Sequence, residues 1–224
     1  MDDISVTALM PMKAHSERLP NKNIKIFHGK PLYQVVLDTL IKSRYIKEII
    51  INTDIESILS LTDINQKVKL VERPENLRGD FVPFFDIIEY DMSQTKTDIF
   101  LHTHSSNPIL RTKTIDNAIL TFANNDSYDS LLGVNRLNKR AYSSDKSPIN
   151  HDPHDKLLRT QDLGPIYVDN SCLYIFTRES FRNAGNHRIG RTPYFYEMDE
   201  MESIDIDFEK DFYFAETIYK EFQD

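Results

Sequence analysis

Several residue types and segments are scarce or absent in this chain, and each absence excludes a class of protein. A single cysteine, Cys172, among 224 residues excludes an internal disulfide framework. No apolar run reaches the ~18 residues of a transmembrane helix, so we expect no membrane span. The net charge of -8 argues against non-specific nucleic-acid binding. The opening Met1-Asp2-Asp3 is acidic, so we expect no signal peptide and a cytoplasmic protein.

The usual glycine-rich phosphate motifs are also missing. The chain has only six glycines and contains neither a Walker A spacing nor a Gly-x-Gly-x-x-Gly segment. Cys172 precedes the apolar residues 173–176, which predicts a buried strand thiol, because a reactive cysteine needs an accessible, electropositive setting. Any phosphate-binding site in this chain therefore depends on other residues.

What is present is an alternation of strand-like and helix-like segments. Apolar runs predict strands at residues 6–10, 46–52, 68–71, 99–102, 130–134 and 173–177. Helical spacing of apolar residues predicts helices at 33–43, 84–92, 112–124 and 212–222. This order predicts an α/β fold with a mostly parallel sheet and helices on both faces. Ligands of such sheets bind beyond the carboxyl ends of the strands.

Residues 135–165 break this pattern. Proline, asparagine, aspartate, histidine and lysine dominate there, which indicates an inserted loop or arm. A long irregular stretch in a compact domain is usually functional or is ordered by a partner subunit.

A basic loop follows the first predicted strand. Lys13, Ser16, Arg18 and Lys22 lie within ten residues of one another. Cations neutralise phosphate charge and backbone N–H groups add donors, so this loop suits a polyphosphate. The alternative is a solvated basic turn.

Two carboxylates alternate with isoleucines near the other end of the chain. In an extended strand, Ile204 and Ile206 share one face, and Asp205 and Asp207 share the other. Oxygen ligands suit Mg²⁺, which usually takes one or two carboxylates together with substrate phosphates. The alternative is an amphipathic edge strand with an acidic face.

The histidines form two pairs, His102 with His104 and His151 with His154. No cysteine or carboxylate at ligand spacing accompanies either pair, so a zinc site is not indicated. We expect the histidines at the strand end to hydrogen-bond a ligand instead.

Short motifs extend this pattern along nearly the whole chain. In order they are Ser-x-Arg-Leu-Pro-x-Lys-Asn (16–23), Gly-Lys-Pro-Leu (29–32), Thr-Asp (53–54), Arg-Pro-x-x-Leu-x-x-Asp (73–80), His-Ser-Ser-Asn-Pro (104–108), Arg-Thr-Gln-Asp (159–162), Tyr-Val-Asp-Asn (167–170) and Ser-Ile-Asp-Ile-Asp (203–207) with Asp-Phe (211–212). Together they resemble the acylneuraminate cytidylyltransferases, or CMP-sialic acid synthetases, and more distantly the CMP-KDO synthetases. The match at 203–207 is the most specific.

The resemblance implies a Rossmann-like single domain over residues 1–224, with a dimerisation arm at about 135–191 and therefore a homodimer. It implies transfer of CMP from CTP to a 2-keto-3-deoxy sugar acid, with release of pyrophosphate. The implied site residues are catalytic Lys13, Lys22 and Asp207; nucleotide-binding Ser16, Arg18, Asn23, Arg73 and Asp80; acceptor-binding His104, Arg159 and Gln161; and Mg²⁺ ligands Asp205 and Asp207.

Five positions depart from the family pattern. Lys13 replaces an arginine, which keeps the charge and loses the bidentate fork. Ala14 and His15 replace glycines, Glu17 replaces a lysine, and His104 replaces a glutamine. These departures leave open which sugar acid is the acceptor. They also leave open a related enzyme that activates a different acid or a sugar phosphate, and a non-catalytic nucleotide-binding relative.

Overall fold

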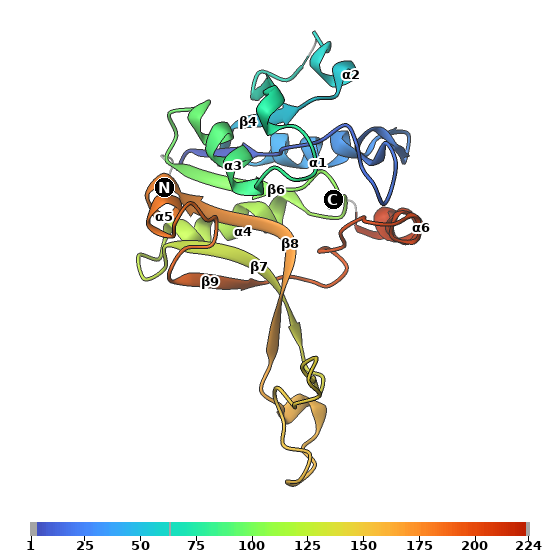
Figure 1. Cartoon of the computed structure of the whole chain (residues 1–224), viewed down its shortest axis with the longest axis vertical. Coiled ribbons are helices and arrows are strands. Elements are labelled where there is room, and N and C mark those ends of the chain that lie inside the picture. Colours follow the sequence, from blue (N-terminus) through green and yellow to red (C-terminus); the bar gives the residue numbers. More distant parts are fainter. Residues whose placement is uncertain (1–3, 63, 223–224) are drawn as a thin grey trace.

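A seven-stranded sheet forms the centre of the computed structural model, which describes residues 4–62 and 64–222 (Figure 1). Its strands are β1 (Val6–Leu9), β4 (Ile46–Thr53), β5 (Val68–Glu72), β6 (Ile99–Thr103), β7 (Ser130–Leu137), β8 (Ile166–Thr177) and β9 (Pro193–Glu197). The spatial order is β5-β4-β1-β6-β8-β7-β9. All neighbours pair in parallel except β8, which is antiparallel to β6 and β7. The predicted mostly parallel sheet is confirmed.

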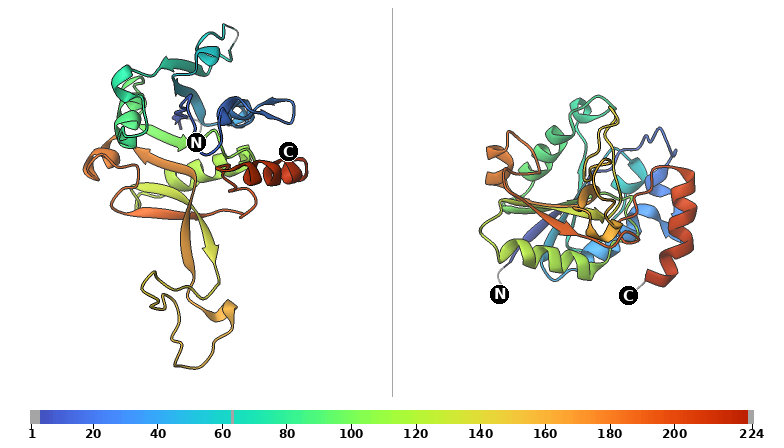
Figure 2. Two further views of the ribbon diagram at one scale, coloured as in Figure 1. Left: turned by 45° about the vertical axis from the view of Figure 1, so that its right-hand side comes forward. Right: turned by 90° about the horizontal axis from the view of Figure 1, so that it is seen from below.

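Helices cover both faces of this sheet (Figure 2). They are α1 (Leu32–Lys42), α2 (Glu56–Leu59), α3 (Phe84–Ser93), α4 (Thr112–Ala123), α5 (Arg178–Asn183) and α6 (Glu209–Tyr219). Leu40 of α1 and Ile119 of α4 pack on one face, and Ile88 of α3 and Phe181 of α5 pack on the other. Burying each such side chain stabilises the fold by about 1.5–3 kcal/mol. No helix in the described ranges combines the length and apolarity that a bilayer crossing requires.

A third apolar cluster packs the segments that flank the start of α1 against α6 and the segment before it. It joins Phe27 and Leu32 to Ile206, Phe212 and Ala215. Phe27 belongs to a two-stranded ribbon of β2 (Ile26–Phe27) and β3 (Lys30–Pro31). The remaining elements are the 3₁₀ turns η1 (Lys22–Ile24), η2 (Glu75–Leu77), η3 (Thr160–Asp162) and η4 (Lys220–Phe222). The cluster therefore places the segment before α6 next to the loop after β1.

All six strands and all four helices of the predicted α/β alternation are present, whereas the strands β2, β3 and β9 and the helices α2 and α5 were not predicted. Cys172 is fully buried in β8, as expected for a strand thiol, and burial raises its pKa. α6 begins three residues before the predicted 212–222 helix, because the Asp211 carboxylate accepts the N–H groups of Asp207 and Phe208 at 3.1 and 2.8 Å. Such side-chain acceptors satisfy donors that a helix start leaves free.

The predicted strand at residues 204–207 is wrong. This segment is extended but belongs to no sheet among the described residues. It crosses the carboxyl edge of the main sheet, where the Ile206 N–H donates to the Ser106 carbonyl at 2.9 Å and the Lys22 Nζ donates to the Ile206 carbonyl at 2.7 Å. The expected alternation survives in part, since Ile206 is fully buried and Asp207 is partly exposed.

An arm projects from the sheet between β7 and β8 (Figure 1). The two strands pair up to Leu132–Tyr174, shift register, and pair again from Val134–Asp169 to Leu137–Ile166. Ser171 takes a φ of 57° opposite this shift. A bulge of this kind bends and re-aims a strand pair. The predicted arm at about 135–191 thus includes the projecting residues and also α5 in the body; its part in dimerisation stays a prediction.

Gly133 sits in the bulge, and Gly133→Ala should destabilise the protein. A Cβ there would lie 2.7 Å from the Met198 Sδ and 2.8 Å from the Asn170 Oδ1. Overpacking of this kind costs about 1–3 kcal/mol. Urea unfolding measures the loss. Gly164→Ala in the arm is the matched control, because a Cβ at Gly164 meets nothing within 4 Å. Equal stability of the two variants would contradict the prediction.

Candidate active site

A cavity of about 380 Å³ opens at the carboxyl edge of the sheet. Its walls come from the segments that follow β1, β5 and β6, because the ends of parallel strands meet at one edge. Eight of the predicted site residues line it: Lys13, Ser16, Arg18, Lys22, Asn23, Arg73, Asp80 and His104. The structure therefore brings together residues that are far apart in the chain.

Hydrogen bonds hold the loop after β1 against the neighbouring loops. The Asn23 Nδ2 donates to the Lys13 carbonyl at 2.9 Å, and the Ser105 Oγ donates to the Asn23 Oδ1 at 2.6 Å. The Ala14 N–H donates to the Asp54 Oδ1 at 2.6 Å. Asn23 therefore shapes the loop as well as lining the cavity.

Each cation of the loop is paired with a carboxylate. The Lys13 Nζ lies 2.5 Å from the Asp80 Oδ1, and this hydrogen bond lowers the pKa of Asp80. The Arg18 Nη1 lies 2.8 Å from the Asp207 Oδ2, and the Lys22 Nζ lies 3.5 Å from the Asp207 Oδ1. An anionic ligand would have to take over these cations from their carboxylates.

Asp205 lies beside Asp207 with an unused acceptor. Its Oδ1 is buried and has no hydrogen-bond partner within the described part of the chain. Burial raises the pKa of the Asp205 carboxyl, and Ser106 and Lys22 oppose the shift. A bound cation would satisfy this orphaned oxygen, so the pair of aspartates fits a hard ion such as Mg²⁺. No larger group of metal-ligating residues is assembled among residues 4–62 and 64–222.

Arg73 reaches the cavity from a buried polar network that the sequence did not reveal. The Arg73 Nε donates to the Asn52 Oδ1 at 2.9 Å, and its Nη2 donates to the Asn52 carbonyl at 3.1 Å. The Asn52 Nδ2 donates in turn to the Asp91 Oδ1 at 2.5 Å. Asn52 and Asp91 are fully buried, and burial raises the pKa of Asp91 to about 7. The asparagine thus orients the guanidinium through its side-chain Oδ1 and its backbone carbonyl, while Asp91 holds its Nδ2.

The predicted ligand-binding histidine, His104, stands in the cavity wall just after β6. Burial, Arg188 and Lys22 lower its pKa to about 3, so the ring is neutral at physiological pH. His102 is fully buried in β6, and its Nδ1 lies 3.0 Å from the Arg188 Nη1. His151 lies in the arm and is bonded to the Tyr142 hydroxyl at 2.9 Å. Neither histidine pair forms a metal site in the described residues.

Arg159 and Gln161 do not reach this cavity within one chain. Both belong to the exposed arm around η3, and neither lines the cavity (Figure 1). The Arg159 Nε instead lies 2.7 Å from the Asp162 Oδ2. Their proposed contact with a sugar acid stays a prediction that needs another copy of the chain.

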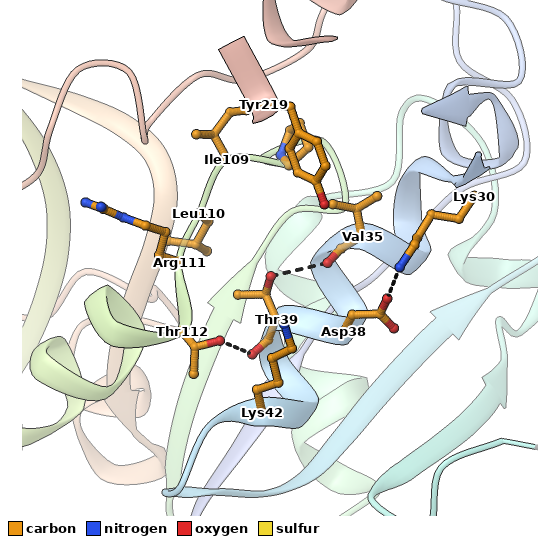
Figure 3. Close-up of a pocket in the computed structure, with 11 residues that line it drawn as sticks. Lys30, Val35, Asp38, Thr39, Lys42, Ile109, Leu110, Arg111, Thr112 and Tyr219 are labelled. Atoms are coloured by element: carbon orange, nitrogen blue, oxygen red, sulfur yellow. Dashed lines mark hydrogen bonds and ion pairs between the residues drawn. The ribbon is translucent and has the colours of Figure 1, made fainter. Parts of the chain in front are cut away.

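A smaller cavity of about 170 Å³ lies beside α1 (Figure 3). It shares no lining residue with the first cavity. Lys30 is paired with Asp38 at 2.6 Å there, and Thr112 donates to the Thr39 carbonyl at 3.0 Å. It offers a single carboxylate, Asp38, and therefore no pair of carboxylates that would suit a metal ion.

A parallel sheet with a polar cavity at its carboxyl edge defines a nucleotide-binding type of α/β domain. The chain belongs to the cytidylyltransferase family, whose sequence profile matches residues 7–223.

Curated relatives carry more specific names. The chain is 25% identical over 212 residues to an N-acylneuraminate cytidylyltransferase of Streptococcus agalactiae, covering 91% of this chain and 51% of that protein. It is 25% identical over 218 residues to the Escherichia coli protein of the same name, covering 95% and 52%. It is 23% identical over 183 residues to a pseudaminic acid cytidylyltransferase of Campylobacter jejuni, covering 77% and 78%. The chain spans about half the length of the N-acylneuraminate relatives.

Solved structures share the fold. A CMP:2-keto-3-deoxy-manno-octonic acid synthetase in complex with CTP superposes with a TM-score of 0.68 at 13% identity, over 97% of this chain and 99% of that one. The 4-diphosphocytidyl-2C-methyl-D-erythritol synthase of Anaerococcus prevotii also gives 0.68, at 11% identity and 96% of each chain. The predicted Rossmann-like architecture is thus confirmed.

Asp91 should make the stability depend on pH. Its pKa is raised from 3.8 to about 7, so the folded state binds a proton that the unfolded state releases, and stability falls as pH rises from about 4 to 7. The full shift corresponds to at most about 4 kcal/mol. Asp91→Asn should flatten this slope in urea unfolding at several pH values.

The control for this experiment is Asp126→Asn, at an exposed carboxylate. It should retain the wild-type slope. A slope that Asp91→Asn leaves unchanged would show that Asp91 does not titrate in this window.

Proposed function

We propose that this protein transfers CMP from CTP to the anomeric hydroxyl of a 2-keto-3-deoxy sugar acid of the sialic type and releases pyrophosphate. The observation that carries the proposal is the pairing of Arg18 and Lys22, which line the cavity, with Asp207 of the segment before α6, in a chain of the cytidylyltransferase family. The names of the curated relatives support the acceptor class. The proposal includes a cytoplasmic location, where CTP is available.

The cations of the loop receive the triphosphate in this proposal. Lys13, Arg18 and Lys22 exchange their carboxylate partners for phosphate oxygens. They then stabilise the negative charge that develops on pyrophosphate as the bond to the α-phosphorus breaks. Ser16, Asn23, Arg73 and Asp80 seat the nucleoside and the phosphates along the same wall.

Asp205 and Asp207 would hold Mg²⁺ in this proposal. The same exchange that moves Arg18 and Lys22 to phosphate releases the Asp207 carboxylate for this purpose. When bound, the ion supplies a Lewis acid that lowers the pKa of the incoming hydroxyl. Neutral His104 can hydrogen-bond the acceptor or the nucleotide without adding charge.

Incubation with CTP, Mg²⁺ and a panel of 2-keto-3-deoxy acids tests the proposal. Pyrophosphate release with an eight- or nine-carbon acid, together with mass-spectrometric detection of the CMP-sugar, would support it. CTP binding without release for any acid would contradict it.

A second candidate is a related nucleotidyltransferase that activates a different acid or a sugar phosphate. His104 in place of glutamine favours it, and the fold does not separate the two, because both solved structures superpose equally well. Sugar phosphates and other nucleoside triphosphates in the same panel distinguish the candidates. A non-catalytic relative would release no pyrophosphate in any combination.

Asp207→Ala should reduce turnover by at least about 100-fold, because it removes a carboxylate from the proposed metal site. CTP binding measured by calorimetry should persist, since Arg18 and Lys22 lose a competing partner. Glu209→Gln is the matched control, because Glu209 is an exposed carboxylate two residues away that pairs with Lys25 at 2.6 Å. Normal turnover of Asp207→Ala would refute the metal assignment.

We also propose that the arm joins two copies of the chain into a homodimer. Tyr142, Ile149, Leu157 and Leu158 are 55%, 58%, 80% and 46% exposed there. Apolar side chains gathered on one projection are typical of an interface. In such a dimer the arm of one copy could bring Arg159 and Gln161 to the cavity of the other.

Leu157→Asp should therefore convert the dimer into a monomer, because a buried carboxylate at an apolar interface is costly. Sedimentation velocity measures the change. Leu61→Asp is the control, since Leu61 is 43% exposed and lies outside the arm. A wild-type protein that sediments as a monomer would refute the dimer.

A further inference from the structure

Arg188 occupies an unusual place between α5 and β9. Its guanidinium carbon lies 3.5 Å from the ring centroid of Tyr174 and 5.2 Å from that of Phe84. The planar group is thus flanked by two aromatic rings, which attract a cation through their faces. Stacking of this kind leaves the edge of the guanidinium available for hydrogen bonds in its own plane.

Part of that edge is unused. A guanidinium has five N–H donors, and two side chains of the described residues bond Arg188: His102 through its Nδ1 at 3.0 Å, and Tyr174. The Arg188 Nε is buried without a partner among the described residues. Burial lowers the pKa of the guanidinium. A partly buried cation with idle donors is costly unless an acceptor joins it.

No carboxylate of residues 4–62 and 64–222 forms an ion pair with Arg188. Asp169 favours the charged guanidinium from a distance, but its Oδ1 accepts the Tyr174 hydroxyl at 2.7 Å. The other neighbours of Arg188, His102 and His104, are neutral rings that its charge helps to keep unprotonated. Among the described residues, the Arg188 guanidinium therefore has no paired counter-ion.

The position of Arg188 connects it to the cavity. Phe84 and His104 both line the cavity wall, and both neighbour Arg188 on the side of β6 and β8. Arg188 itself does not line the cavity and lies behind these two side chains. A ligand that extends beyond the phosphates toward Phe84 and His104 would therefore approach Arg188.

We propose that Arg188 binds the carboxylate of the acceptor and so selects acids over neutral sugars. The inference rests on the proposed function and adds the acceptor-binding residue to it. In the ring form of a 2-keto-3-deoxy acid, the carboxylate and the attacking hydroxyl are attached to the same carbon. Two parallel hydrogen bonds from a guanidinium fix the plane of a carboxylate. Holding the carboxylate thus orients the hydroxyl toward the α-phosphorus.

The test compares Arg188→Gln, Arg188→Lys and two other arginine variants in pyrophosphate release. Each enzyme receives CTP with the best acid of the panel, or with the C1 carboxamide of that acid. Arg191→Gln is the matched control, an exposed arginine of the same loop. Arg159→Gln represents the rival carboxylate anchor in the arm. Calorimetric CTP binding verifies that every variant is folded, because CTP does not need Arg188.

The expected result is a loss of about 100-fold in kcat/KM for the acid in Arg188→Gln, with unchanged KM for CTP. Wild type should prefer the acid to the amide by a similar factor, about 100-fold, and Arg188→Gln should lose that preference. The kcat/KM of Arg188→Lys for the acid should lie between those of wild type and Arg188→Gln, because lysine keeps the positive charge and loses the two-pronged hydrogen bonding of the guanidinium. If Arg188 had a purely structural role, its substitution would lower kcat/KM for the acid and for the amide equally.

Two results would overturn the inference in distinguishable ways. If Arg188→Gln keeps the preference for the acid and Arg159→Gln loses it, the anchor is Arg159 and the proposed function stands. If wild type binds CTP but uses no acid of the panel, the proposed function fails and the acceptor role of Arg188 fails with it.

Discussion

The contacts of Lys22 hold the candidate site together. Its Nζ donates to the Ile206 carbonyl across 184 positions of the chain and lies 3.5 Å from Asp207. The Lys22 side chain is only 16% exposed, so its interactions are screened less than those of a surface lysine. Through Lys22 the loop after β1 and the segment before α6 become one wall. The packing of Phe27 and Phe212 beneath them supports the same juxtaposition.

The charge balance of the cavity follows from this arrangement. Cations that suit phosphate and carboxylates that suit a metal neutralise each other while no ligand is bound. Since Lys13, Arg18 and Lys22 already have carboxylate partners, folding does not have to leave these cations unpaired at the edge of the sheet. In the proposed function, the same pairing makes nucleotide and metal binding interdependent, because a ligand that captures Arg18 also liberates Asp207.

The sequence predicted most of the fold because strand and helix periodicities are local. The apolar residues within 46–52 are enough to predict a strand, and the apolar spacing within 112–124 is enough to predict a helix. The segment 204–207 shows the limit, since its alternation is that of a strand while its hydrogen-bond partners, Ser106 and Lys22, belong to distant loops. The cationic loop was visible as a cluster in sequence.

Other parts of the site had no local signal. Asn52 lies within an apolar run, and Asp91 within an amphipathic helix, so only the packing of α3 on β4 brings them to Arg73. Arg188 lies in an irregular loop. Its contacts with the rings of Phe84 and Tyr174 depend on the pairing of β8 with β6. Conversely, the motif around Arg159 was evident in the sequence, but within one chain Arg159 does not line the cavity at the sheet edge.

The register shift in β7 and β8 has a consequence for how this protein can change. Up to Val134 β7 is tied to β9 of the sheet, and from Asn135 onward β7 and β8 pair only with each other. Insertions or deletions within residues 138–165 therefore leave the cavity walls of the same chain in place. The arm can be reshaped, in evolution or by engineering, as a module that alters assembly and, in the proposed dimer, what Arg159 and Gln161 bring to the other copy.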